Sequence, residues 1–277
     1  MVNTLIAFPY RLIKLIPKFI KGIKDKIQIL ASLNGANHIL IKENYSTDSY
    51  LEVLKNSELK IYKMQEKDEE DAFYFLFENL FRGSIEEIKK RQSIYLPYVT
   101  EAHANSKGSF FLDAGCGRGE FLSLLDGHGV PARGVEINRL AIDLVKKGNI
   151  DVMLSDAFEY LKGLEDRSLI GLSMFQVIEH LDFKRINDIL KSAFKKISPN
   201  GIIILESVNP YCPVALGNFY LDPNHIRPYA PDLMKFMLEW HGFEKVKIIY
   251  SSLIPNQFKK AVRNYQDYAV LGKKMKL

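Results

Sequence analysis

Short apolar runs separated by polar, helix-like segments recur through the second half of the chain. The first run ends in Asp113, and glycines follow at positions 115, 117 and 119 before a helix-like run that begins at Glu120. An apolar run of this length, bounded by turn residues, predicts a buried parallel strand. The pattern therefore predicts a strand, a glycine loop and a helix in succession.

Four further strands are predicted by the same pattern, and polar residues mark their carboxyl ends. The second strand lies in ARGVEIN and ends at Glu136, and the third lies in DVMLSDAFEYL and ends at Asp156. The fourth lies in LIGLSMFQVIEHL and is followed by Gln176, Glu179 and His180. The fifth lies in GIIILESVNP. Ligands of open α/β sheets bind outside the carboxyl ends of the strands. We therefore expect these polar residues to surround one ligand site.

The glycine loop is a poor match for a nucleotide phosphate. Gly119 is followed by Glu120 and Phe121, where a phosphate-binding loop requires lysine and serine or threonine. A dinucleotide fingerprint would need glycine at position 120, and a carboxylate there would repel a pyrophosphate. The loop suits a nucleoside without phosphates, and Glu136 can accept hydrogen bonds from both ribose hydroxyls.

With these motifs the sequence resembles the class I S-adenosylmethionine-dependent methyltransferases over roughly residues 80–277. Their glycine motif is matched by Asp113-Ala-Gly115-Cys-Gly117-Arg-Gly119, their ribose acid by Glu136 and their adenine-side acid by Asp156. The resemblance implies a Rossmann-like α/β fold, a seven-stranded sheet from about residue 108 to 277 whose last strand is antiparallel. It also implies S-adenosylmethionine as the cofactor. The expected cofactor contacts are Arg82, Asp113, Gly115, Cys116, Gly117, Glu136, Ile137, Asp156, Ala157 and Gln176.

The segment before the sheet is expected to be helical and to cover the cofactor. Ser84 and Glu87 have the spacing of a capping box, which predicts a helix from there to about Pro97. Arg82 precedes that cap, and we expect it to be the cation for the methionine carboxylate of the cofactor. The same residue could instead form an ordinary surface ion pair.

Composition and charge narrow the class of protein. The chain has 277 residues, of which 47% are hydrophobic, so it can form a full core with a further segment. Two cysteines, Cys116 and Cys212, provide neither a disulfide framework nor a zinc spacing, which favours a reducing, cytoplasmic location. The net charge is +5, and residues 1–30 account for all of it through six basic residues against Asp25. The neutral remainder argues against a nucleic-acid partner.

Residues 1–30 carry apolar residues at helical spacing, with basic residues mostly on the other face. A basic amphipathic helix suits an anionic membrane surface, such as the inner face of the cytoplasmic membrane, or it packs on this domain or a partner subunit. We divide the chain into this segment (1–40), a helical arm with cofactor-covering helices (41–107) and a methyltransferase domain (108–277). The oligomeric state is left open.

Two histidines are the candidate catalytic bases. His180 follows the fourth strand, close to where the methyl group is expected, and His225 lies in a proline-braced loop after the fifth strand. Such a base is needed when the acceptor is a hydroxyl, because its proton leaves as the oxygen attacks. The loop also contains aromatic and charged groups that suit a carbohydrate. Its expected substrate contacts are Tyr220, Asp222 and Arg227.

The segments FRGSIEEIKKRQSIYLPYV and FYLDPNHIRPYAPDLMKFMLEWHGF resemble bacterial methyltransferases that modify O-antigen and related surface polysaccharides. This resemblance implies O-methylation of a sugar hydroxyl on a glycan or glycolipid. Three alternatives stay open: methylation of a terminal phosphate, a metal-dependent 2′-O-methyltransferase, and a non-catalytic scaffold. The metal alternative is weakened because Gln176 stands where small-RNA 2′-O-methyltransferases carry a carboxylate ligand. We therefore expect no metal.

Overall fold

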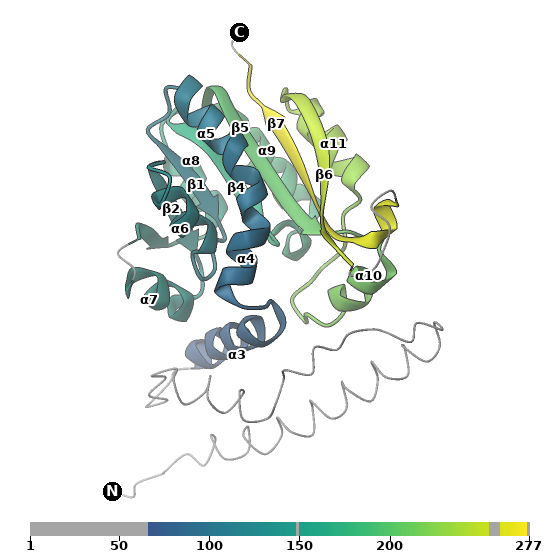
Figure 1. The fold of residues 1–277 in the computed structure, drawn as a ribbon. Coiled ribbons are helices and arrows are strands. Elements are labelled where there is room, and N and C mark those ends of the chain that lie inside the picture. Colours follow the sequence, from purple (N-terminus) through teal and green to yellow (C-terminus); the bar gives the residue numbers. More distant parts are fainter. Residues whose placement is uncertain (1–65, 148–149, 255–260, 276–277) are drawn as a thin grey trace, which may run out of the picture. The chain divides into compact units, whose positions relative to one another are not determined.

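The chain forms a seven-stranded sheet with helices on both faces (Figure 1). The structure is a computed structural model that describes residues 66–147, 150–254 and 261–275. Residues 71–277 form one compact unit. The predicted amphipathic segment (1–40) and residues 41–65 of the predicted arm lie outside the described residues.

The sheet confirms the predicted strands and their directions. Its order is β3-β2-β1-β4-β5-β7-β6, and β1 to β5 run parallel. The last strand, β7, is antiparallel to both of its neighbours, β5 and β6. The strands are β1 (Phe110–Ala114), β2 (Ala132–Glu136), β3 (Val152–Leu154), β4 (Leu169–Phe175), β5 (Ile197–Val208), β6 (Glu244–Leu253) and β7 (Tyr265–Lys273). The strand order reverses between β1 and β4, which is where such sheets bind ligands.

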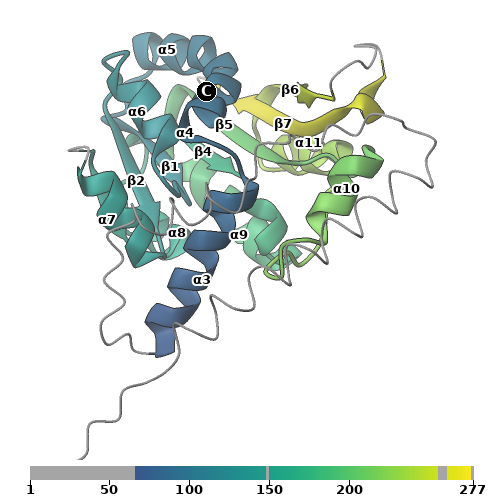
Figure 2. The ribbon, with the colours of Figure 1, turned by 60° about the horizontal axis from the view of Figure 1, so that its bottom comes forward.

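The helices form two layers around the sheet (Figures 1 and 2). Apolar side chains of α8, α9 and α11 pack on one face, and those of α5 and α6 pack on the other. The helices are α3 (Glu66–Phe81), α4 (Ile85–Gln92), α5 (Leu96–Asn105), α6 (Glu120–Asp126), α7 (Arg139–Lys147), α8 (Ala157–Gly163), α9 (Phe183–Lys196), α10 (Pro213–Phe219) and α11 (Pro231–Trp240). Short 3₁₀ turns occupy Ser93–Tyr95, Ile178–His180 and Val262–Asn264.

The helix predicted after Ser84 begins where expected but ends earlier. Ser84 caps α4 and forms the full capping box with Glu87. The helix stops at Gln92, and Pro97 lies in the first turn of the next helix, α5. Proline removes a backbone donor and clashes inside a helix, but it is tolerated in a first turn. The expected end at Pro97 was therefore wrong, because that proline helps to start a second helix.

No helix among the described residues is both long and apolar enough to cross a membrane.

The packing of β4 generates a stability prediction. A Cβ at Gly171 would lie 2.5 Å from the Ile202 carbonyl oxygen and 2.6 Å from the Phe111 ring. Because backbone and a core ring must both shift, we expect Gly171→Ala to lower the free energy of unfolding by about 1–3 kcal/mol.

Urea unfolding measures this loss, and Gly217→Ala is the matched control. A Cβ at Gly217, in α10, would meet nothing within 4 Å. We therefore expect that variant to be unchanged or more stable by about 0.5–1 kcal/mol. Equal unfolding midpoints for the two variants would contradict this account of the sheet.

Candidate functional site

The glycine loop after β1 has the conformation that its sequence predicts. Gly115, Gly117 and Gly119 have φ angles of 74°, 49° and 76°, in the left-handed region where side chains are strained. Asp113 lies beneath the loop and is buried, and it accepts a hydrogen bond from the Ser173 hydroxyl at 2.6 Å. Burial raises the pKa of Asp113 to about 7. The Asp113 side chain therefore ties the end of β1 to β4, just before the loop.

Glu136 lies at the end of β2 and contacts the loop. Its carboxylate accepts from the backbone N–H groups of Gly117 at 2.9 Å, Ile137 at 2.8 Å and Asn138 at 3.0 Å. The side chain is only half-buried, which leaves it accessible to a ligand such as a ribose. The neighbouring Ile137 side chain is 66% exposed, which leaves an apolar surface beside this carboxylate. An adenosine has both a hydroxyl pair and an apolar ring that match these two features.

Asp156 and Ala157 begin α8 near the same edge. Asp156 caps the helix, accepting from the Phe158 and Glu159 N–H groups, and Arg185 forms an ion pair with it at 2.5 Å. Burial opposes ionisation, but these hydrogen bonds and Arg185 together lower the pKa of Asp156. All of these contacts go to the Oδ1 atom. Asp156 is exposed, so its second oxygen can face an adenine amino group.

Two arginines stand at the glycine loop, and they have different surroundings. Arg118 is buried, donates to Glu120 at 2.7 Å and to Asn79 at 3.1 Å, and also donates to the Gly83 carbonyl at 3.0 Å. It thereby ties the turn between α3 and α4 to the loop. The guanidinium of Arg82 comes within 3.3 Å of the position that a Cβ on Gly117 would take.

Arg82 therefore lies beside the glycine loop, where its expected role in cofactor binding requires it. Arg82 also forms an ion pair with Glu78 at 3.1 Å, within α3. Burial lowers the pKa of Arg82, but the Glu78, Glu120 and Glu206 carboxylates more than offset it and the net pKa is raised. A fixed cation at the loop matches the carboxylate of a methionine moiety.

Gln176 follows β4 with a left-handed φ of 56°, which is unusual for a residue with a side chain. Its amide nitrogen lies 3.4 Å from the buried Glu206 and 3.3 Å from the half-buried Asp267, so it contacts two carboxylates. Burial raises the pKa of Glu206 to about 7, with the Asp267 charge adding to the effect. Tyr95 donates to the other oxygen of Glu206. Gln176 thus links the carboxylates of Glu206 and Asp267 just after the end of β4.

His180, Asp222 and His225 come together beside the end of β4. The two imidazole rings are 4.6 Å apart, and His225 Nε2 lies 3.7 Å from Asp222 Oδ2. Each ring has its Nδ1 atom against a backbone carbonyl: Asn224 for His180, at 3.2 Å, and Phe219 for His225, at 2.6 Å. Because Nδ1 is the donor in both rings, Nε2 of each neutral ring carries a lone pair.

Burial lowers the pKa of His180 to about 4, and the neighbouring His225 contributes to the shift. His180 is therefore neutral at physiological pH and able to accept a proton. His180, Asp222 and His225 each offer one ligand atom, and these three atoms lie within 4.8 Å of one another. The cluster is therefore also a possible metal site.

The carboxylate of Glu179 is turned away from this cluster. It is fully buried and accepts from the Ser207 hydroxyl at 2.9 Å. Its backbone carbonyl accepts from the Ile226 N–H at 2.8 Å, which holds the loop that carries Asp222 and His225. Burial raises the pKa of Glu179 to about 8. The carboxylate in the cluster belongs to Asp222. The sequence motif from Gln176 to His180 gives no sign that Asp222 takes this place.

The three predicted substrate contacts have different positions in the loop after β5. Asp222 belongs to the cluster, whereas Tyr220 is 75% exposed and Arg227 is exposed with its guanidinium over the Tyr229 ring. The sequence did not single out Tyr74, in α3. Its hydroxyl donates to Asp222 at 2.9 Å and lies 3.4 Å from His180 Nε2. The only sequence feature that marked Tyr74 was its position within a run of aromatic residues.

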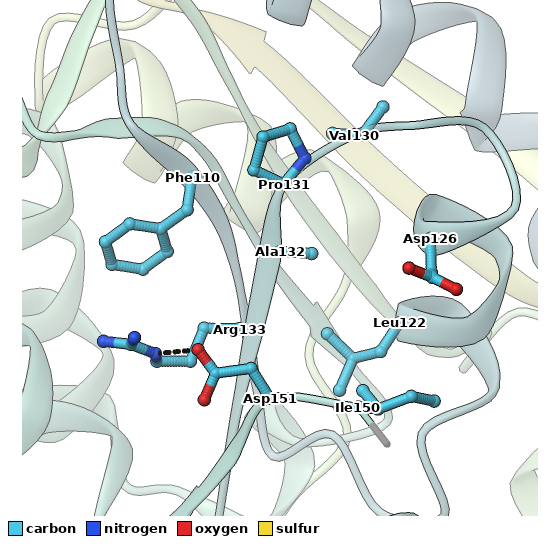
Figure 3. Close-up of a pocket in the computed structure, with 9 residues that line it drawn as sticks. All are labelled: Phe110, Leu122, Asp126, Val130, Pro131, Ala132, Arg133, Ile150 and Asp151. Carbon is cyan, nitrogen blue, oxygen red and sulfur yellow. Dashed lines mark hydrogen bonds and ion pairs between the residues drawn. The ribbon is translucent and has the colours of Figure 1, made fainter. Parts of the chain in front are cut away.

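A separate cavity of about 330 Å³ lies at the amino-terminal ends of β1 and β2 (Figure 3). Arg133 lines it and donates to Asp151 at 2.6 Å and to the Tyr160 hydroxyl at 2.8 Å. The cavity is at the opposite ends of the strands from the glycine loop. We therefore assign the chemistry to the loop and the histidine cluster.

Comparison with known proteins identifies the family. Residues 88–252 match the family model described as "Methyltransferase domain". A SAM-dependent methyltransferase of Archaeoglobus fulgidus has 36% identity and a TM-score of 0.65, covering 73% of this chain and all of its own. The chain belongs to the S-adenosylmethionine-dependent methyltransferases. S-Adenosylmethionine is its cofactor, and the Arg82, Gly117 and Glu136 positions fit its methionine and ribose parts.

More distant solved structures share the fold. A possible histamine N-methyltransferase of Thermotoga maritima has 17% identity, a TM-score of 0.52 and coverage of 74% of this chain and 97% of its own. Phosphoethanolamine N-methyltransferase 2 of Haemonchus contortus, in complex with S-adenosylmethionine, has 13% identity and a TM-score of 0.50, with coverage of 72% and 59%. No curated protein sequence matches this chain.

The contacts of Glu136 generate a binding prediction. We expect Glu136→Ala to weaken S-adenosylmethionine binding by about 1.5–3 kcal/mol, because the ribose hydroxyls lose a charged acceptor. Isothermal titration calorimetry measures the change. Glu159→Ala is the control, since Glu159 is exposed on α8 and pairs with Lys162. An affinity equal to that of the native protein would refute the ribose assignment.

Proposed function

We propose that this enzyme methylates a sugar hydroxyl of a bacterial surface polysaccharide, such as O-antigen or capsule. The observation that carries the proposal is the pair of neighbouring imidazoles whose Nδ1 atoms are held by backbone carbonyls, so that the Nε2 atom of each neutral ring carries a lone pair. A weakly acidic hydroxyl needs such a base, whereas an amine with a free lone pair does not. The sequence resemblance to polysaccharide methyltransferases supports the sugar as the acceptor.

The transfer requires the acceptor oxygen in line with the bond between sulfur and the methyl carbon. As the new C–O bond forms, the S–CH₃ bond breaks and its electron pair stays on sulfur, leaving S-adenosylhomocysteine. The hydroxyl proton passes to Nε2 of His180 or His225. Much of the acceleration is expected from holding the two reactants in this geometry. Burial keeps His180 unprotonated before the transfer, but the lowered pKa also makes this imidazole a weaker base than an exposed one.

The loop after β5 supports a carbohydrate as the acceptor. Tyr220 presents an exposed ring, and Arg227 and Asp222 add charged groups within the same short segment. Aromatic faces next to polar groups match the apolar faces and hydroxyls of a sugar ring. We propose Tyr220, Asp222 and Arg227 as acceptor contacts.

A metal-dependent transfer is the second candidate, and the convergence of His180, Asp222 and His225 favours it. Metal-bound histidines usually donate their other N–H to a carbonyl or carboxylate, as both rings do here. Two imidazoles and a carboxylate suit a divalent transition metal better than Mg²⁺. A metal would bind the acceptor oxygen as a Lewis acid, and the histidines would then be ligands rather than bases.

Removal of each histidine tests the proton acceptor. We expect His180→Ala or His225→Ala to lower turnover roughly 10²–10⁴-fold, the usual share of general base catalysis. S-Adenosylmethionine affinity should be unchanged, and EDTA should leave the native enzyme active. The assay uses S-adenosylmethionine labelled in the methyl group with polysaccharide extracted from cells that lack the gene.

The other outcomes distinguish the alternatives. Loss of native activity in EDTA, restored by Mn²⁺ or Zn²⁺, would favour the metal. Full activity in both histidine variants with damage in Arg227→Ala would favour a phosphate acceptor. A chain that does not bind S-adenosylmethionine in calorimetry would be a scaffold. Mass spectrometry of the cell's polysaccharide, with and without the gene, identifies the methylated sugar.

We infer that residues 1–30 bring the enzyme to an anionic membrane surface, where glycolipid acceptors are found. The net charge of +5 and the apolar helical spacing in this segment support the inference. Replacing Lys14, Lys18 and Lys21 with Gln should reduce co-sedimentation of the full chain with phosphatidylglycerol vesicles. Added salt should reduce native binding as well. Equal binding to neutral phosphatidylcholine vesicles would contradict an electrostatic contact.

A further inference from the structure

Helix α3, from Asp71 onward, is anchored to the cofactor side of the domain at two points. The Asp71 carbonyl accepts from the Asn138 side-chain amide at 2.8 Å, and the Asp71 carboxylate accepts from the Arg139 N–H at 3.2 Å. Farther along the helix, the Asn79 side chain accepts from Arg118, in the glycine loop, at 3.1 Å. Side chains near these two anchors are therefore held beside the cofactor site.

Glu78 and Arg82 form an ion pair next to the second anchor. Arg82 Nη1 donates to Glu78 Oε1 at 3.1 Å, and each side chain is 18% exposed. The same Nη1 atom lies 3.3 Å from the position that a Cβ on Gly117 would take. The pair thus presents one positive and one negative group beside the backbone of the glycine loop.

This ion pair leaves most of its hydrogen-bonding capacity unused. A guanidinium has five N–H donors, and a carboxylate can accept on both of its oxygens. Among the described residues, the Arg82 guanidinium donates only to Glu78, and Glu78 Oε2 accepts no hydrogen bond. Both groups are therefore able to bind a charged ligand at the loop without breaking their own contact.

Other carboxylates at the loop are already engaged. Glu120 forms a buried ion pair with an arginine of the loop, Asp113 accepts from a serine of β4, and Glu136 accepts from three backbone N–H groups. Burial raises the pKa of Glu78, the Arg82 guanidinium lowers it, and the Glu136 carboxylate raises it again. A second cation beside Glu78 would stabilise its ionised form.

The charges of the pair match the amino-acid end of S-adenosylmethionine, in which an ammonium and a carboxylate share one carbon atom. An ammonium has three donors, and a guanidinium binds a carboxylate through parallel N–H groups. We propose that Glu78 binds the ammonium of the cofactor while Arg82 binds its carboxylate, so that α3 recognises the amino-acid end of the ligand. Arg82 was expected from the sequence to bind the carboxylate, and the structure adds Glu78.

The inference depends on the cofactor and not on the proposed acceptor. It would hold whether the methyl group passes to a sugar hydroxyl or to a phosphate. The product, S-adenosylhomocysteine, has the same ammonium and carboxylate as S-adenosylmethionine. It is therefore a stable probe of this contact, and its binding can be measured without any acceptor.

Glu78→Gln tests the proposal, because it removes the charge, keeps the shape and leaves an amide oxygen that can accept from Arg82. We expect the Kd for S-adenosylhomocysteine, measured by isothermal titration calorimetry, to rise roughly 10- to 100-fold, the range for a hydrogen bond to a charged group. Glu86→Gln is the matched control. Glu86 is exposed on α4 and lies 3.7 Å from Lys89, so this variant should bind with native affinity.

Two ligand analogues distinguish direct binding from a structural effect. A deaminated S-adenosylhomocysteine, with hydrogen in place of the ammonium, should bind the native protein more weakly, and Glu78→Gln should weaken it no further. A decarboxylated analogue should still respond to Glu78→Gln, whereas Arg82→Gln should not weaken its binding.

Three results would overturn the proposal. They are native affinity in Glu78→Gln, an equal loss for the intact and deaminated ligands in that variant, and equal binding of these two ligands by the native protein. The last comparison needs no variant, so it remains decisive if Glu78→Gln does not fold. None of these results would affect the proposed acceptor, which the His180→Ala and His225→Ala variants test separately.

Discussion

The buried ion pair between Arg118 and Glu120 is the interaction on which the rest of the site depends. Both side chains are only 2% exposed, and the guanidinium also holds Asn79 and the Gly83 carbonyl. Breaking a buried pair by removing one partner leaves an unpaired charge and is strongly destabilising. Here the same charge joins the glycine loop to the turn between α3 and α4. The connection holds Asn79, which lies between Tyr74 and Arg82 in the chain.

Electrostatics around the cofactor follow from that arrangement. The site combines Arg82 with several carboxylates, of which Asp113, Glu206 and the half-buried Asp267 have raised pKa values. Burial disfavours their charged forms, and the neighbouring arginine and hydroxyl groups favour them. The cofactor brings a sulfonium, an ammonium and a carboxylate into this mixed environment. The excess of carboxylates over arginines complements S-adenosylmethionine, which has a net positive charge. The sulfide product, S-adenosylhomocysteine, has no net charge to match it.

The fold could be predicted from the sequence because its signals are local. A buried strand followed by glycines, as at Asp113, needs only a few consecutive residues to be recognised, and the Ser84 cap is equally local. The end of the α4 helix was not predictable in this way, since the chain leaves the α-helix at Gln92, before a 3₁₀ turn, and Pro97 marks only the start of the next helix. The pairing of Tyr74 with Asp222 spans 148 positions. No periodicity along the chain predicts such a contact. The surroundings of Glu179 were equally unpredictable, because it is next to His180 in the sequence but its carboxylate accepts a hydrogen bond from Ser207.

The left-handed backbone of Gln176 has a consequence for how this protein can change. A residue with a side chain pays about 1–3 kcal/mol to hold such a conformation, and glycine would relieve most of it. Yet the amide of Gln176 separates the carboxylates of Glu206 and Asp267, which would repel each other without a donor between them. Selection for stability alone would therefore favour glycine at position 176, whereas selection for turnover would favour glutamine. A population evolving at higher temperature would be expected to gain stability elsewhere in the sheet and to retain the strained amide.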